Sequence, residues 1–138
     1  MIFLFGCEGW FDATSMTIEY VTLEKMPFQD SNNHDWDDDS TPDVYFRFEE
    51  TSVWERSEST IYLGVSESDL PKEWTIDPGF TLTDFRNKLV VSVYDSDFLS
   101  SDLIGSAEFE FDAGDDTEVW TLDLSDDLQI TIEVSYTY

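Results

Sequence analysis

The chain has 138 residues, the size of one ordinary domain, and carries 32 acidic against six basic residues, a formal net charge of −26. Hydrophobic residues make up 41% and aromatic residues 16%, which is too apolar for an acidic disordered tail. The small number of lysines and arginines argues against nucleic-acid binding, because many basic side chains are needed to neutralise the phosphates. One cysteine and one histidine argue against a structural zinc site, which needs about four such ligands.

The chain begins with a short apolar run that ends at its single cysteine. The run Leu4-Phe5-Gly6-Cys7 resembles a bacterial lipobox, in which a signal peptide is cut before a cysteine that is then lipidated. The resemblance implies a protein of the cell envelope or the cell exterior, anchored through Cys7. The run before Cys7 is short for a signal and lacks Lys and Arg, so the alternative is an apolar tail with an incidental cysteine. We assign residues 1–15 to an N-terminal tail and residues 16–138 to the domain.

After the tail, short runs of alternating apolar and polar residues are separated by polar turns. Alternation with period two buries one set of side chains, and it is clearest over residues 128–136. Residues 44–49 and 108–111 alternate in the same way, and residues 89–94 are β-branched enough for an inner strand. Weaker candidates are residues 16–23, 60–65, 79–82 and 117–122. About eight short strands without helical spacing predict an all-β, eight-stranded antiparallel β-sandwich.

Two acidic loops offer the oxygen atoms that calcium (Ca2+) binds. The first is the long break over residues 29–43, which is rich in aspartate and ends at Asp43, just before a strand. The second leaves the strand at residues 89–94 with Asp95 and Asp97, and Asp102 follows after a short spacer. Asp95 and Asp97 turn to the same side of an extended segment, and calcium takes about six to eight oxygens. The alternative is a pair of solvated turns, because aspartate favours turns in any case.

The second loop reads Asp95-Ser96-Asp97 and then Asp102-Leu103-Ile104-Gly105. This spacing resembles the third calcium loop of C2 domains, the modules found in synaptotagmin and protein kinase C. The exit of the family's first loop is similar to Thr41-Pro42-Asp43-Val44-Tyr45, with proline and aspartate exchanged. Between the two loops the family has a further motif run, and three segments of this chain resemble it: Pro71-Lys72-Glu73-Trp74, Phe80-Thr81-Leu82 and residues 89–95. The resemblance covers nearly all of the chain after the tail.

The resemblance implies a sandwich of C2 type with calcium-binding loops at one end. Aspartates supply most of the calcium ligands in this family. Four of them are matched by position: Asp43, Asp95, Asp97 and Asp102. A further ligand comes from earlier in the first loop, where Asp30, Asp35 and Asp37 are candidates and Asp30 is the first choice.

Phe98 and Leu99 occupy the tip of the third loop, where C2 domains carry apolar residues that enter a bilayer. They are therefore candidate membrane contacts, and the alternative is that they fold back over the end of the sandwich. The resemblance implies a calcium-binding, non-catalytic module that attaches to a phospholipid membrane or another anionic ligand. The alternative is a surface-anchored lipoprotein scaffold for other proteins, with calcium only structural or absent.

Overall fold

The computed structural model describes residues 14–29, 32, 41–53, 56–59, 61–97, 101–110 and 118–137, and for residues 77 and 78 only the backbone. Within these ranges the strands are β1 (Ser15–Lys25), β2 (Val44–Glu50), β3 (Arg56–Glu58), β4 (Lys72–Leu82), β5 (Leu89–Ser96), β6 (Ser101–Phe109), β7 (Glu118–Ser125) and β8 (Leu128–Thr137). A short 3-10 helix, η1 (Glu67–Asp69), precedes β4.

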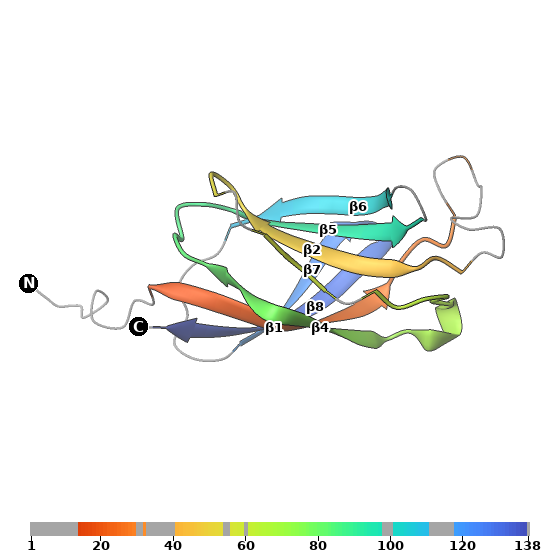
Figure 1. Ribbon diagram of the computed structural model, residues 1–138, viewed down its shortest axis with the longest axis horizontal. Helices are drawn as coiled ribbons and strands as arrows, with labels where there is room; N and C mark the ends of the chain where they lie inside the picture. Colours follow the sequence, from red (N-terminus) through yellow and green to blue (C-terminus); the bar gives the residue numbers. More distant parts are fainter. Residues whose placement is uncertain are drawn as a thin grey trace, which may run out of the picture.

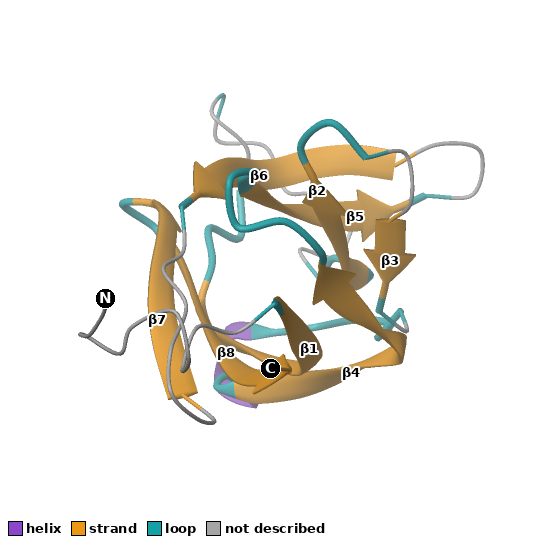
Figure 2. Cartoon of the chain, turned by 90° about the vertical axis from the view of Figure 1, so that its left-hand side faces the viewer, coloured by secondary structure: helices purple, strands orange, loops and turns teal. Residues whose placement is uncertain are grey.

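The strands form two four-stranded sheets, in the orders β4-β1-β8-β7 and β3-β2-β5-β6. Each pair of neighbouring strands is antiparallel. Figure 1 shows one sheet above the other, and Figure 2 shows the two sheets on opposite sides of the core. The predicted antiparallel β-sandwich is confirmed.

The core is built from the inward-facing residues of both sheets. On β8 every second residue from Leu128 to Val134 is buried, while Glu133 and Ser135 are exposed. Val44, Phe46 and Phe48 of β2 and the matching residues of β5 form the opposite layer. Burying each such side chain contributes about 1.5–3 kcal/mol, so the period-two alternation specifies which face of each strand turns inward. The predicted inner faces of β2 and β8 are confirmed, and β5 is an inner strand of its sheet, as predicted.

The strand predicted for residues 60–65 is wrong. The strand in this region is β3, which precedes it, and within residues 61–65 the backbone forms only an isolated bridge, between Tyr62 and Val44. Gly64 has φ +62°, a conformation that side-chain-bearing residues avoid, and the chain bends there. The run was therefore misread as a strand, and the side chains of residues 61–63 are exposed.

The directions of the strands separate the two ends of the molecule. The last residues of β5 pair with Val44, the first residue of β2, and with Ser101, the first residue of β6. These three strand termini therefore lie together at one end of the molecule. β1 begins and β8 ends at the other end, where Ser15 pairs with Thr137. Figure 1 shows these two ends at the right and left of the view. We call the right-hand end, with Val44, Ser96 and Ser101, the loop end.

Candidate metal centre

The hairpin of β5 and β6 brings three of the predicted aspartates together. Asp95 lies opposite Asp102 across the two strands, and Ser96 lies opposite Ser101. Asp97 directly follows β5. One carboxylate oxygen from each of Asp95, Asp97 and Asp102 lies within 4.8 Å of the other two. We call these three residues the acidic cluster.

An irregularity in the strand pairing sets this arrangement. Val93 pairs with Gly105, but the next residue, Tyr94, pairs with Leu103, so Ile104 is an extra residue on β6. Such a bulge changes which side chains of the bulged strand face those of its partner. Beyond it, Asp102 stands across from Asp95. Asp102 therefore belongs to a strand and not to the loop in which the sequence pattern had placed it.

Asp95 is the buried member of the cluster and is held by the first-loop exit. Its Oδ1 atom accepts a hydrogen bond from the Asp43 amide at 2.9 Å, and its side chain is fully buried. The Ser96 amide donates to the Asp43 carbonyl at 2.7 Å. The two predicted loops therefore meet at one end of the molecule, and Asp43 reaches the cluster through its backbone.

The carboxylate of Asp43 has a different contact. Its Oδ1 atom accepts a hydrogen bond from the Gly64 amide at 2.9 Å, and the group of carboxylates within 4.8 Å of one another, searched over the described residues, does not include it. The preceding carbonyl, of Pro42, accepts from the Val65 amide at 2.9 Å. Asp43 thus links the cluster to the segment after β3.

Two further residues position this region, and the sequence pattern assigned neither of them a role in the site. Trp74 is buried, and its Nε1 donates to the Val44 carbonyl at 3.0 Å. Gly64 supplies the amide that binds Asp43. The Pro71-to-Trp74 motif was a signal for Trp74, whereas the contact of Gly64 depends on a bend that the sequence pattern did not predict.

Four predicted site residues lie outside the described residues: Asp30, Cys7, Phe98 and Leu99. The same applies to the alternative ligands Asp35 and Asp37.

The acidic cluster fits a calcium ion by chemistry and by size. Calcium–oxygen distances are about 2.3–2.6 Å, so two oxygens on one ion lie at most about 5 Å apart, and the spacing within the cluster is compatible with that limit. Carboxylate oxygens are the hard donors that calcium prefers. Like charges directly opposite each other across two strands repel, and a divalent cation between them removes that repulsion.

Comparison with solved structures identifies the architecture. A C2 domain of plant Extended Synaptotagmin 1 superposes with a TM-score of 0.66 at 15% identity, over 91% of this chain and 95% of that one. The chain has the C2 fold. Calcium-bound Extended-Synaptotagmin 2, a chain of two C2 domains, covers 91% of this C2-fold chain at TM-score 0.60 and 12% identity, with 46% of its own length matched. Human GIVD cytosolic phospholipase A2 matches at TM-score 0.66 and 13% identity, over 91% of this chain and 17% of its own.

No protein-family model matches the chain, and no curated protein sequence matches it significantly. The likeness to C2 domains is therefore carried by the arrangement of the strands and not by overall sequence identity. Among the described residues there is no helix with the length and apolar character needed to cross a membrane.

Proposed function

We propose that this C2-fold protein is a calcium-binding module that attaches to a phospholipid surface, or to another anionic partner, through calcium. The observation that carries the proposal is the convergence of three carboxylates within 4.8 Å at the loop end. The C2 fold of the chain and the likeness to a calcium-bound structure of that fold support the proposal. We propose no catalytic role for the domain.

The proposed ligands are the acidic cluster, with Asp43 and Asp30 contributed from the first-loop side. Asp95 is held in place by the Asp43 amide, so its carboxylate has little freedom to turn away from its neighbours. Asp43 is bonded to the end of β5 through its backbone, while its carboxylate contacts Gly64. Binding at this end therefore involves the segment after β3 as well as the two acidic loops.

Calcium supplies positive charge between carboxylates and the oxygens of an anionic partner. With a net charge of −26, the chain is repelled by anionic lipid unless a cation lies between them. The acidic cluster lies at the loop end, the right-hand end of the sandwich in Figure 1, and Asp102 is its exposed member. Phe98 and Leu99 are proposed as the apolar contacts with the bilayer, because they follow Asp97 directly.

We also propose that Cys7 tethers the protein to the cell envelope, on the strength of its lipobox-like sequence. β1 begins at the end opposite the loop end (Figure 1). A tether that leads into β1 favours orientations in which the acidic cluster faces away from the anchor, toward a second surface or partner.

Thermal unfolding with and without calcium tests the ion site. Ligand at about a hundredfold its dissociation constant stabilises the folded state by about 2.7 kcal/mol, and for a domain of this size we expect Tm to rise by roughly 5–10 °C. The double variant Asp95→Asn/Asp97→Asn should lose this rise. The charge-matched control Glu118→Gln/Glu133→Gln, on β7 and β8 toward the other end, should keep it. An unchanged Tm of the wild-type protein in calcium would overturn the proposal.

Sedimentation with anionic vesicles separates attachment from a purely structural ion. We expect the wild-type protein to sediment with phosphatidylserine vesicles in calcium and to remain in the supernatant when the calcium is chelated. A rise in Tm without sedimentation would restrict calcium to a structural role.

A further inference from the structure

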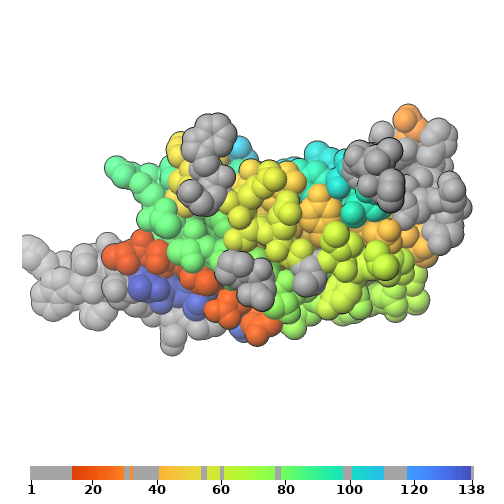
Figure 3. All heavy atoms as spheres, viewed as in Figure 1, coloured from red at the N-terminus to blue at the C-terminus, as the bar shows by residue number. Residues whose placement is uncertain are grey.

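Three consecutive large apolar residues are exposed at the loop end. Ile61, Tyr62 and Leu63 are 47%, 36% and 79% exposed, and we call them the 61–63 tip. Isolated exposed apolar side chains are common, but a contiguous group of them marks a contact surface. Figure 3 shows the yellow-green residues that follow β3 on the surface toward this end. Neither the sandwich core nor the proposed ion site uses their exposed surface.

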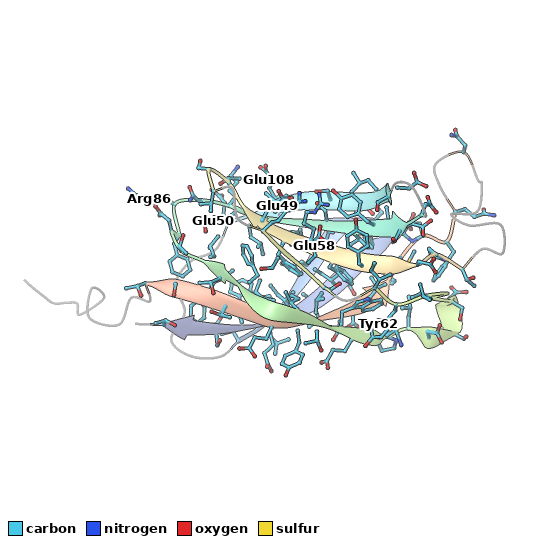
Figure 4. The ribbon with its side chains drawn as sticks, in the orientation of Figure 1. Glu49, Glu50, Glu58, Tyr62, Arg86 and Glu108 are labelled. Atoms are coloured by element: carbon cyan, nitrogen blue, oxygen red, sulfur yellow. The ribbon has the colours of Figure 1, made fainter. Side chains whose placement is uncertain are left out.

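The 61–63 tip is fixed beside the candidate metal centre. Tyr62 and Val44 exchange two backbone hydrogen bonds, of 2.9 and 3.0 Å. Gly64, which directly follows the tip, donates a backbone hydrogen bond to the Asp43 carboxylate. The Tyr62 ring packs edge-on against the Trp74 ring, with the ring centroids 5.1 Å apart. Because these hydrogen bonds and ring contacts hold the bend at several points, the backbone keeps the Leu63 side chain exposed. Figure 4 shows Tyr62 beside the first part of β4.

The tip is accompanied by positive charge, which is scarce in this chain. Lys72 lies with its Nζ 4.4 Å from the centre of the Tyr62 ring. Lys25 ends β1 on the strand next to Lys72, so two of the six basic residues lie at this end. Asp69 interacts with Lys72. Hydrogen bonds from Ser66 lower the pKa of Asp69, and the charge of Lys72 lowers it further. Asp69 therefore stays ionised and offsets part of the positive charge of Lys72. Exposed aliphatic residues with a tyrosine and a lysine are the composition of segments that sit at a membrane–water interface.

We propose that the 61–63 tip enters the interfacial region of a phospholipid bilayer as an apolar contact beside the acidic cluster. This inference rests on the proposed function and extends its contact surface. A bilayer fits the 61–63 tip better than a protein partner does. A stable protein interface buries roughly 800 Å² on each partner, and three side chains on a bend are too few for that. A bilayer requires only a protruding apolar group close to the point of attachment.

The variant Ile61→Ser/Leu63→Ser tests the tip, because serine removes the apolar groups and leaves the backbone hydrogen bonds in place. In saturating calcium we expect its affinity for phosphatidylserine vesicles to fall about tenfold or more, while the calcium-induced rise in Tm is kept. Val119→Ser is the matched control, since Val119 is 67% exposed but lies on the edge strand β7, opposite Glu133 in the middle of β8. Equal vesicle affinity of the tip variant and the wild-type protein would overturn the inference.

A fluorescent label gives a second, independent readout. The chain has one cysteine, so Leu63→Cys in a Cys7→Ser background accepts a polarity-sensitive dye at a single position. We expect its emission to shift to the blue when vesicles and calcium are both present, and the same dye at Val119→Cys to stay unchanged. If the protein sediments with vesicles while the dye at position 63 reports water, the tip inference alone fails. If the protein does not sediment at all, the inference fails together with the proposed lipid attachment.

Discussion

At the scale of single residues, two buried carboxylates show how environment decides what an acidic side chain does. Asp95 is buried among other carboxylates at the loop end. Glu50, also buried, lies at the other end of β2, where it accepts hydrogen bonds from Thr83, Asp84 and Asn87 at 2.8 to 3.0 Å. Neutral donors stabilise the charge of Glu50, so it needs no cation, and it ties β2 to the turn after β4 (Figure 4).

Replacing Glu50 should destabilise the fold and leave the ion site intact. Glu50→Gln brings an amide donor to face other donors, so we expect a loss of about 2–3 kcal/mol in the free energy of unfolding. Urea denaturation measures this loss. Glu49→Gln, at the neighbouring position on β2, should change stability by less than about 0.5 kcal/mol. A Glu50→Gln protein as stable as the wild-type protein would show that these hydrogen bonds contribute little.

At the scale of elements, β6 passes close to Leu128 of β8 near the acidic cluster. Gly105 lies on β6 directly over the buried Leu128, and a β-carbon at this position would clash with a methyl group of that leucine. Gly105 is separated from Asp102 by only two residues. The glycine that ends the Asp102-to-Gly105 motif therefore has a packing reason: it lets the strand that carries Asp102 lie close to the core.

Gly105→Ala should therefore strain the packing between the sheets. Overpacking of this kind costs about 1–3 kcal/mol, which chemical denaturation can measure. Leu128→Ala removes the clashing methyl group and is destabilising by itself, by about 2–5 kcal/mol. We expect the double variant to lose less stability than the sum of the single variants. Strict additivity would mean that the two residues do not clash.

At the scale of the whole molecule, the surface is dominated by negative charge. With 32 acidic against six basic residues, the chain repels itself, which disfavours the compact state. Ion pairs such as Arg86–Asp84 and Lys88–Glu108 offset little of this excess, because they are exposed. The pKa of Asp84 is nevertheless lowered to about 2, mainly by hydrogen bonds from the Arg86 side chain and amide.

Monovalent salt should stabilise the protein by screening this repulsion. The Debye length falls from about 10 Å at 0.1 M to about 3 Å at 1 M, so we expect Tm to rise by a few degrees over that range. Calcium at matched ionic strength should raise Tm further, and Asp95→Asn/Asp97→Asn should keep the response to sodium chloride while losing the excess due to calcium. The same response to both salts would argue that calcium acts only by screening.

Local patterns in the sequence were sufficient for the inner faces and for the hairpin that carries the cluster. The side-chain period of a strand is fixed by backbone geometry, so alternation over residues 128–136 predicts burial without knowledge of the neighbouring strands. Asp95, Asp97 and Asp102 are close in the chain, so a single hairpin brings them together. Their convergence could therefore be predicted, whereas the pairing of Asp102 within β6 could not.

The tertiary structure alone decided what depends on contacts between distant segments. Residues 60–65 were a weaker strand candidate, yet Ile61 and Leu63 face water, because an apolar run alone does not specify whether a second sheet lies over it. The bond from Gly64 to Asp43 and the contact of Lys72 with Tyr62 join segments that no local pattern relates. The amino-acid sequence by itself determined a sandwich with acidic turns, since strand periodicity is local. The packing of the two sheets decided which turns, lysine side chains and apolar side chains lie together at one end.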